Sequence, residues 1–432
     1  MGLALRDDAR AAARRPLRFL TAGSVDDGKS TLIGRLLFDG RAILADQLDA
    51  LAARAAGAPI DLALLTDGLE AEREQGITID VAYRYFATAR RKFIIADAPG
   101  HEQYTRNMVT AAAGSDAAVV LVDATKLELD AEPLVLLPQT RRHALLAQLL
   151  RVPHIVFAVN KLDAVADPDA AFARVRSALV AFADEAGFVA AGIVPISALH
   201  GDNVSRPSGL AGADGPTLLE LLEQLPEDDG AAHGSALLPV QFVANAATSG
   251  AGHRPRVLWG RVARGELAAG DEIVVFPSGE HARIAELHAA GRRIAHVGAG
   301  RSAGVVLDRQ LDVSRGDWIA APGSIAPTAR FRATLAWLDT EPAVVGRKYW
   351  LRHGNRWLQG RIAAIESRLD IATLAAHPAD ALGVNDIGEV VVETAQPLPV
   401  ASFADDRVAG AVLVVDPATN RSSGSLLVRA AA

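Results

Sequence analysis

The apolar residues of the first half of the chain fall in short runs separated by amphipathic stretches. Five runs predict buried strands, at residues 17–22, 93–96, 117–122, 155–159 and 192–196. Amphipathic stretches at 31–38, 140–150 and 170–186 lie between strands and predict helices. Apolar strands that alternate with helices are typical of a mostly parallel sheet with helices on both faces.

The pattern changes after residue 228. The polar, breaker-rich stretch 226–234 predicts a linker. Short alternating segments with Gly or Pro turns then predict antiparallel strands, at 257–262, 272–276, 304–307, 331–338, 349–352, 389–393 and 412–415, with a second boundary at 322–327. We therefore expect an α/β domain over residues 1–228, followed by two antiparallel β-barrel domains over residues 236–323 and 327–432.

Composition narrows the class of protein. The 432 residues are 50% apolar and 22% charged, as in globular proteins, and carry a net charge of −7. The acidic balance argues against a nucleic-acid partner, which requires clustered Lys and Arg. The chain has no cysteine, no signal-peptide pattern and no apolar run long enough for a spanning helix. We expect a cytoplasmic protein with no membrane partner.

The first predicted strand leads into a phosphate-binding motif. Residues 23–30 read G-S-V-D-D-G-K-S, which fits G-x-x-x-x-G-K-[ST], and a predicted helix follows directly. Backbone N–H groups and the helix N-terminus bind phosphate oxygens in such a loop. Lys29 would reach the outer phosphates, and the Ser30 hydroxyl would bind Mg²⁺. The candidate nucleotide contacts here are Gly23, Ser24, Val25, Asp26, Asp27, Gly28, Lys29, Ser30 and Thr31.

Four further motifs follow in order along the chain, and three of them come directly after predicted strands. Thr78 would be a second ligand near Mg²⁺, and Asp97 would hold the ion through a water. Asp163 would accept hydrogen bonds from guanine that adenine cannot donate, while the Lys161 stem packs on the purine. The remaining candidate contacts are Asp97, Ala98, Pro99, Gly100, His101, Asn160, Lys161, Leu162, Asp163, Ser197, Ala198 and Leu199. Each motif alone occurs by chance, but together they predict an α/β P-loop GTPase domain that binds GTP.

These motifs resemble those of translation-factor GTPases such as elongation factor Tu. The sequence around the motifs resembles one branch of these GTPases more closely. This branch is the GTPase subunit of bacterial ATP sulfurylase, known as sulfate adenylyltransferase subunit 1. The runs Tyr-Arg-Tyr-Phe at 83–86 and Glu-Gln-Tyr-Thr-Arg-Asn-Met at 102–108 discriminate between the two. The similar stretches are residues 23–29, 67–86, 97–108, 346–349 and 351–355, so the resemblance covers most of the chain.

The resemblance implies an enzyme, the regulatory subunit of a sulfate adenylyltransferase, with GTPase activity. In that family it pairs with a smaller catalytic subunit, subunit 2, which makes adenosine 5′-phosphosulfate and pyrophosphate from ATP and sulfate, the first step of sulfate assimilation. GTP hydrolysis drives this uphill step, and the ATP and sulfate chemistry belongs to the partner. The implied cofactors are GTP and Mg²⁺. Whether several heterodimers assemble further stays open.

The same resemblance suggests catalytic roles. His101 would position the hydrolytic water, with a helix cap as the alternative role, and Lys29 and Thr78 would stabilise charge directly or through Mg²⁺. Asp26 matches an aspartate that helps hold a monovalent cation in translation factors, and a turn residue explains it equally well. Residues 70–75 would belong to a switch that GTP orders, or to a solvated helix face.

Several features stay outside this scheme. The link at 127–138 and the stretch 245–256 depart from the family pattern but leave the nucleotide site intact. Arg315-Gly316-Asp317 predicts a hairpin turn rather than an adhesion motif, and His353 and Trp357 are expected to fill or flank strands. Only five lysines stand in the chain, and Lys29 and Lys161 both lie in nucleotide motifs, although small numbers alone can explain this. One alternative function is a translation-factor-like GTPase that delivers aminoacyl-tRNA, which the acidic balance opposes. Another is a GTP-dependent assembly switch with no coupled chemistry.

Overall fold

The chain divides into two compact units, Met1–Glu227 and Asp228–Ala432. The computed structural model describes residues 15–46, 48–49, 53, 60–65, 81–98, 108, 111–112, 114–207, 209, 215–226, 234–245, 255–370 and 373–431. Each unit has buried apolar cores of its own. The finer division into domains at 1–228, 236–323 and 327–432 remains our proposal.

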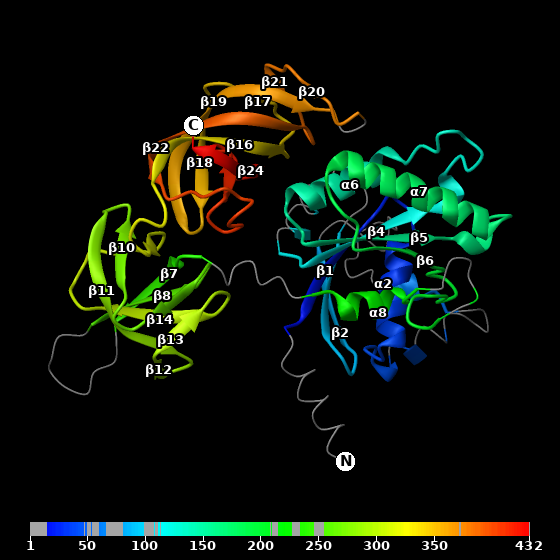
Figure 1. Cartoon of the computed structure of the whole chain (residues 1–432), viewed down its shortest axis with the longest axis horizontal. Coiled ribbons are helices and arrows are strands. Elements are labelled where there is room, and N and C mark those ends of the chain that lie inside the picture. Colours follow the sequence, from blue (N-terminus) through cyan, green and yellow to red (C-terminus); the bar gives the residue numbers. More distant parts are fainter. Residues whose placement is uncertain are drawn as a thin grey trace, which may run out of the picture. The chain divides into compact units, whose positions relative to one another are not determined.

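A six-stranded sheet forms the centre of the first unit (Figure 1). Its strands lie in the order β2-β3-β1-β4-β5-β6, and all neighbours are parallel except β2 and β3. Their bounds are β1 Leu17–Ala22, β2 Ala82–Ala87, β3 Lys92–Asp97, β4 Ala117–Asp123, β5 His154–Asn160 and β6 Gly192–Pro195. The five strands that the apolar runs predict are confirmed, and β2 is an additional edge strand.

Helices cover both faces of this sheet (Figure 1). On one face, α2 (Lys29–Asp39) and α8 (Leu218–Gln224) bury leucines against β1, β3 and β4. On the other face lie α6 (Pro138–Leu149) and α7 (Pro168–Ala186). Phe182 of α7 contacts the Phe188 ring, which in turn contacts Phe157 of β5. Three short 3₁₀ helices complete the described part of this unit: η1 Leu62–Leu65, η3 Ala124–Lys126 and η4 Leu162–Ala164.

The second unit begins with a closed antiparallel barrel. Six strands form the ring β10-β15-β7-β8-β14-β11, which closes because β10 pairs with both β11 and β15. Their bounds are β7 Leu237–Asn245, β8 Arg256–Arg261, β10 Glu272–Phe276, β11 Glu280–Ala289, β14 Ser302–Leu307 and β15 Trp318–Ala320. The short strand β12 Arg292–Ile294 pairs with β11, while β9 Glu266–Ala268 and β13 His296–Gly298 pair with each other in a separate two-stranded sheet.

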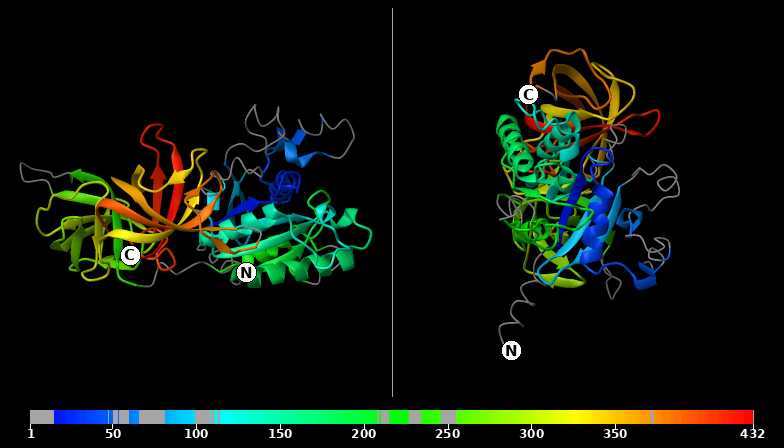
Figure 2. Two further views of the ribbon diagram at one scale, coloured as in Figure 1. Left: turned by 90° about the horizontal axis from the view of Figure 1, so that it is seen from above. Right: turned by 90° about the vertical axis from the view of Figure 1, so that its right-hand side faces the viewer.

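A second closed barrel follows in the same unit (Figure 2). Its ring is β18-β23-β24-β16-β22-β19, closed by the pairing of β18 with β19. The bounds are β16 Thr328–Trp337, β18 Lys348–His353, β19 Arg356–Leu369, β22 Ile387–Leu398, β23 Ala411–Val415 and β24 Ser422–Ala431, with short strands β17 Ala343–Val344, β20 Ala376–His377 and β21 Ala381–Leu382. The predicted fold class, an α/β domain followed by two antiparallel barrels, is confirmed.

Side chains from the two barrels meet within this unit. The His353 ring of β18 stacks on Trp318 of β15 at 4.5 Å between centroids and is fully buried. Arg356 donates to Asp317 at 3.0 Å. Asp317 also accepts the Ser314 N–H, which makes the segment around Gly316 a turn. The predicted turn is therefore present, but it is not a hairpin, because β14 and β15 on either side of it do not pair with each other. Trp357 flanks its strand with half of its surface exposed, also as predicted.

Candidate nucleotide-binding site

The predicted phosphate loop joins β1 to α2 at the carboxyl edge of the parallel strands. Gly28 is the N-cap of α2 and has a φ of 93°, a left-handed conformation that suits glycine. A Cβ on Gly28 would lie 2.5 Å from Nδ2 of Asn160, so the loop and the end of β5 approach each other too closely for any side chain. This packing places the 23–28 backbone beside the second motif.

Side chains donate hydrogen bonds to the carbonyl groups of the loop. A loop that turns its N–H groups toward a phosphate must turn its carbonyls away, and buried carbonyls require donors. Every carbonyl from residue 23 to residue 27 has one. Lys29 Nζ donates to Gly23 O at 2.9 Å and Ser24 O at 2.6 Å, Lys126 to Val25 O, Lys161 to Asp26 O at 2.7 Å, and Asn160 Nδ2 to Asp27 O at 2.8 Å.

Lys29 is the buried cation of the site. Its side chain is folded back on the loop carbonyls, with only 8% of the residue exposed. Burial lowers the pKa of its ammonium, against the attraction of Asp27 and Asp97. An ammonium in this environment gains strongly from an anion, because little water competes for it.

Asn160 connects three of the predicted motifs. It ends β5, its amide nitrogen holds Asp27 O, and its amide oxygen accepts the Ala198 N–H at 2.9 Å. Lys161 follows with a φ of 62° and directs its ammonium to Asp26 O and to the carboxylate of Asp123, 2.7 Å away. The phosphate loop, residues 160–163 and residues 197–199 are thereby brought together.

Asp163 lies in η4 with 30% of its side chain exposed, and its carboxylate is 3.6 Å from Nε2 of His200. Leu162 beside it is buried and anchors the turn. Ser197 is buried and its hydroxyl accepts the His200 N–H, whereas the Leu199 side chain is exposed. The partly exposed Asp163 carboxylate is therefore the group in this turn that can meet a base, with His200 as its partner in this structure.

The Mg²⁺ donors are described in part. Asp97 ends β3 beside Thr21 of β1, and its carboxylate is buried. The negative charge of Asp97 raises the pKa of Lys29, which shows that the two groups lie close together. Ser30 lies in the first turn of α2. A hydroxyl and a carboxylate are oxygen donors of the kind Mg²⁺ prefers, so these two residues fit the ion. Four predicted site residues lie outside the described residues: Thr78, Pro99, Gly100 and His101.

Sequence reasoning missed three charged or titratable residues at this site. Asp123 and Lys126 bracket η3, and both contact the loop or its cations. Although burial acts to raise it, hydrogen bonds from Lys161 and Thr125 bring the pKa of Asp123 below its usual value. His143 of α6 is fully buried. Burial, with Lys29 and Arg142 adding to it, lowers its pKa to about 3, so the ring is neutral. The small number of lysines in the sequence could have pointed to Lys126, because three of the five lysines, Lys29, Lys126 and Lys161, contact this loop.

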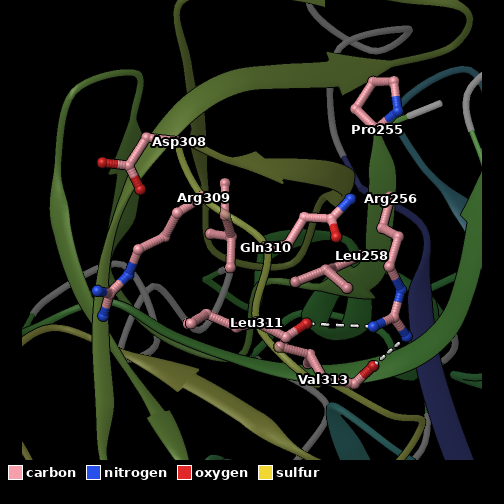
Figure 3. Close-up of a pocket in the computed structure, with 9 residues that line it drawn as sticks. Pro255, Arg256, Leu258, Asp308, Arg309, Gln310, Leu311 and Val313 are labelled. Carbon is pink, nitrogen blue, oxygen red and sulfur yellow. Dashed lines mark hydrogen bonds between the residues drawn. The ribbon is translucent and has the colours of Figure 1, made fainter. Parts of the chain in front are cut away.

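A separate hollow of about 210 Å³ lies in the first barrel (Figure 3). It is lined by Pro255, Arg256, Leu258, Leu307, Asp308, Arg309, Gln310, Leu311 and Val313. Arg256 donates to Leu311 O and Val313 O, as the dashed lines show. Arg309 donates to His281 O. Both cations are occupied by carbonyls, so the hollow does not resemble an anion site.

The phosphate loop, the guanine-type turn after β5 and the two barrels define a P-loop GTPase of the translation-factor class. The family described as "Elongation factor Tu GTP binding domain" matches residues 14–228, and "GTP-eEF1A C-terminal domain-like" matches residues 330–425. Within this class, the chain belongs to the sulfate adenylyltransferase subunit 1 family. It is an enzyme of that family, and its first unit is a GTPase domain.

Three relatives support the assignment. Sulfate adenylyltransferase subunit 1 of Laribacter hongkongensis is 41% identical over 98% of this chain and 87% of its own length. The bifunctional enzyme NodQ of Azospirillum brasilense is 44% identical over 96% of this chain and 66% of its own length. The bifunctional enzyme CysN/CysC of Xylella fastidiosa is 41% identical over 95% of this chain and 65% of its own length. This chain therefore spans about two thirds of the bifunctional relatives.

Proposed function

We propose that GTP hydrolysis in this site drives the synthesis of adenosine 5′-phosphosulfate and pyrophosphate from ATP and sulfate on a smaller catalytic subunit. The observation that carries the proposal is an assembled phosphate loop and guanine-type turn in a chain of this family. The adenylyl transfer belongs to the partner, and this chain supplies the GTP-dependent step. The partner, further assembly of heterodimers and a cytoplasmic location remain predictions.

Lys29 is the main side chain that would bind the phosphates. Its ammonium lies on two loop carbonyls, and β- and γ-phosphate oxygens would replace them as its partners. Because the group is buried, it would stabilise charge that develops during phosphoryl transfer more strongly than a solvated lysine. The loop N–H groups and the N-terminus of α2 add fixed dipoles of the same sign.

Ser30 and Asp97 would hold Mg²⁺, Asp97 through a water, with Thr78 as a third group by resemblance. The ion would neutralise charge on the phosphate oxygens when bound. His101 would orient the attacking water, and its role stays a prediction because it lies outside the described residues. Asp26 has its carbonyl engaged by Lys161, so a monovalent cation there would have to be held by the carboxylate.

Base choice would rest on the turn after β5. Asp163 would accept hydrogen bonds from guanine N1–H and the 2-amino group. A backbone N–H of residues 197–199, other than that of Ala198, which donates to Asn160, would face the guanine carbonyl. Lys161 holds its ammonium on Asp26 O, which stretches the stem along the site where a purine would stack. These contacts favour GTP over ATP, because adenine lacks the two donors.

The test is reconstitution of the chain with a smaller catalytic subunit. We expect the two to co-purify and to make adenosine 5′-phosphosulfate from ATP and sulfate at least tenfold faster with GTP than with GDP or no guanine nucleotide, since GTP hydrolysis offsets the uphill step. Incorporation of radiolabelled sulfate into adenosine 5′-phosphosulfate measures the product. A pair that makes no more product with GTP than without it contradicts the proposal. A salt-sensitive complex with aminoacyl-tRNA would favour the translation-factor alternative.

A further inference from the structure

Lys126 lies outside every nucleotide motif, yet it contacts the phosphate loop directly. It ends η3, the turn after β4, whose start is fixed by Asp123 accepting the Thr125 N–H at 3.0 Å. Its ammonium donates to Val25 O and to Oδ1 of Asp27, 2.8 Å away. The contact spans 99 residues of sequence, so local turn geometry does not explain it.

Asp27 presents an electrostatic problem that this contact resolves. Its carboxylate is completely buried inside a loop that has to receive phosphate anions. The other oxygen, Oδ2, accepts the Ser24 N–H at 2.5 Å, which fixes the tight turn but also occupies one loop donor. A buried, unpaired carboxylate beside a nucleotide would repel its phosphates, whereas the Lys126 ammonium neutralises it.

Lys126 is itself held in place by a row of alternating charges. Asp123 lies 3.8 Å from the Lys126 ammonium and 2.7 Å from that of Lys161. Asp27, Lys126, Asp123 and Lys161 therefore form one row of ion pairs, in which both carboxylates are fully buried. The charges compensate one another, and the two ammonium groups also donate hydrogen bonds to the loop carbonyls of Val25 and Asp26.

We propose that Lys126 is a positioning residue that sets the affinity of the site for guanine nucleotides, by neutralising Asp27 and holding the Val25 carbonyl away from the phosphates. The proposal rests on the proposed function, because it presupposes that the site binds GTP and GDP. Lys126 acts through the loop backbone and Asp27. It should therefore affect the affinities for GDP and GTP equally.

The test follows release of the fluorescent probe mant-GDP from the full chain. Lys126→Met should speed release by about 10- to 100-fold and weaken GTP to a similar degree, as expected for loss of a hydrogen-bonded charge. Lys126→Arg keeps the charge and should stay within about threefold of the unmodified chain. Lys92→Met, which removes an exposed lysine of β3, is the matched control and should change nothing.

A double variant separates positioning from mere support of the fold. If Lys126 acts by neutralising Asp27, then adding Asp27→Asn to Lys126→Met removes the uncompensated charge and should recover at least a third of the lost affinity, on a logarithmic scale. Unchanged release in Lys126→Met, or no recovery in the double variant, overturns the proposal. Loss of GTP but not GDP binding would also overturn it, by placing the ammonium at the γ-phosphate. An unmodified chain that binds no mant-GDP contradicts the proposed function itself.

Discussion

At the scale of single residues, the site is a set of charges held in place by backbone carbonyls. The motif residues Lys29, Asn160 and Lys161 were predictable, because each motif implies a strand end and a ligand. Lys126 was not, since its partners lie about a hundred residues away and no local pattern marks them. Its ion pair with a buried carboxylate is a tertiary feature, and it appears only when β4 and the phosphate loop are folded beside each other.

Asp163 gives the sharpest prediction at this scale. Asp163→Asn sets an amide N–H donor against the N–H donors of guanine, so GTP affinity should fall on the order of 100-fold, while affinity for xanthosine triphosphate, whose base has an acceptor oxygen at that position, should rise. Competition against mant-GDP measures both affinities. Asp169→Asn, the same change in the first turn of α7, is the control and should bind GTP normally. Unchanged GTP affinity in Asp163→Asn would show that this carboxylate does not read the base.

At the scale of elements, the apolar runs predicted the buried strands well, and β1 and β10 have the predicted bounds. The edge strand β2 was missed because it is only half buried, with Tyr83 and Tyr85 exposed. Helix α8 was missed because it has seven residues, although Thr217 and Glu220 form a capping box that marks its start. Short or exposed elements lack the apolar signal on which periodicity depends.

The contact between β15 and β18 makes stability depend on pH. Burial lowers the pKa of His353 from 6.5 to about 4, with the Ala409 carbonyl opposing and Arg356 adding to the shift. Its Nε2 lies 2.9 Å from that carbonyl oxygen, as in a neutral donor ring. Between these pH values the unfolded chain binds the proton and the folded chain does not. Stability is therefore lost as pH falls from about 6.5 toward 4, by about 3 kcal/mol at most.

This loss can be measured by urea unfolding between pH 7.5 and 4.5, followed by tryptophan fluorescence. All five tryptophans lie in the second unit, so the signal reports on the unit that contains His353. His353→Gln keeps a donor for Ala409 but does not titrate, and its stability should depend less on pH. His296→Gln, at an exposed position of β13, should retain the unmodified profile. An equal pH dependence in His353→Gln would refute this assignment.

At the scale of the whole molecule, the fold class and the family follow from the sequence, while the coupling does not. Hydrophobic patterns and motifs along one chain predict the order of the strands, nucleotide motifs and barrels. No described helix of the structure has the length and apolar character needed to cross a membrane. How hydrolysis would act on a partner depends on surfaces of two chains, and one sequence specifies only one of them.

The central claim is that hydrolysis in this site, and not another, drives sulfate activation. Its most direct test changes the base that the site accepts. The chain carrying Asp163→Asn is combined with the unmodified smaller subunit, and formation of adenosine 5′-phosphosulfate from ATP and sulfate is measured with GTP and with xanthosine triphosphate. We predict that xanthosine triphosphate drives the variant pair and GTP drives the unmodified pair. Product formation by the variant pair that still follows GTP would contradict the account.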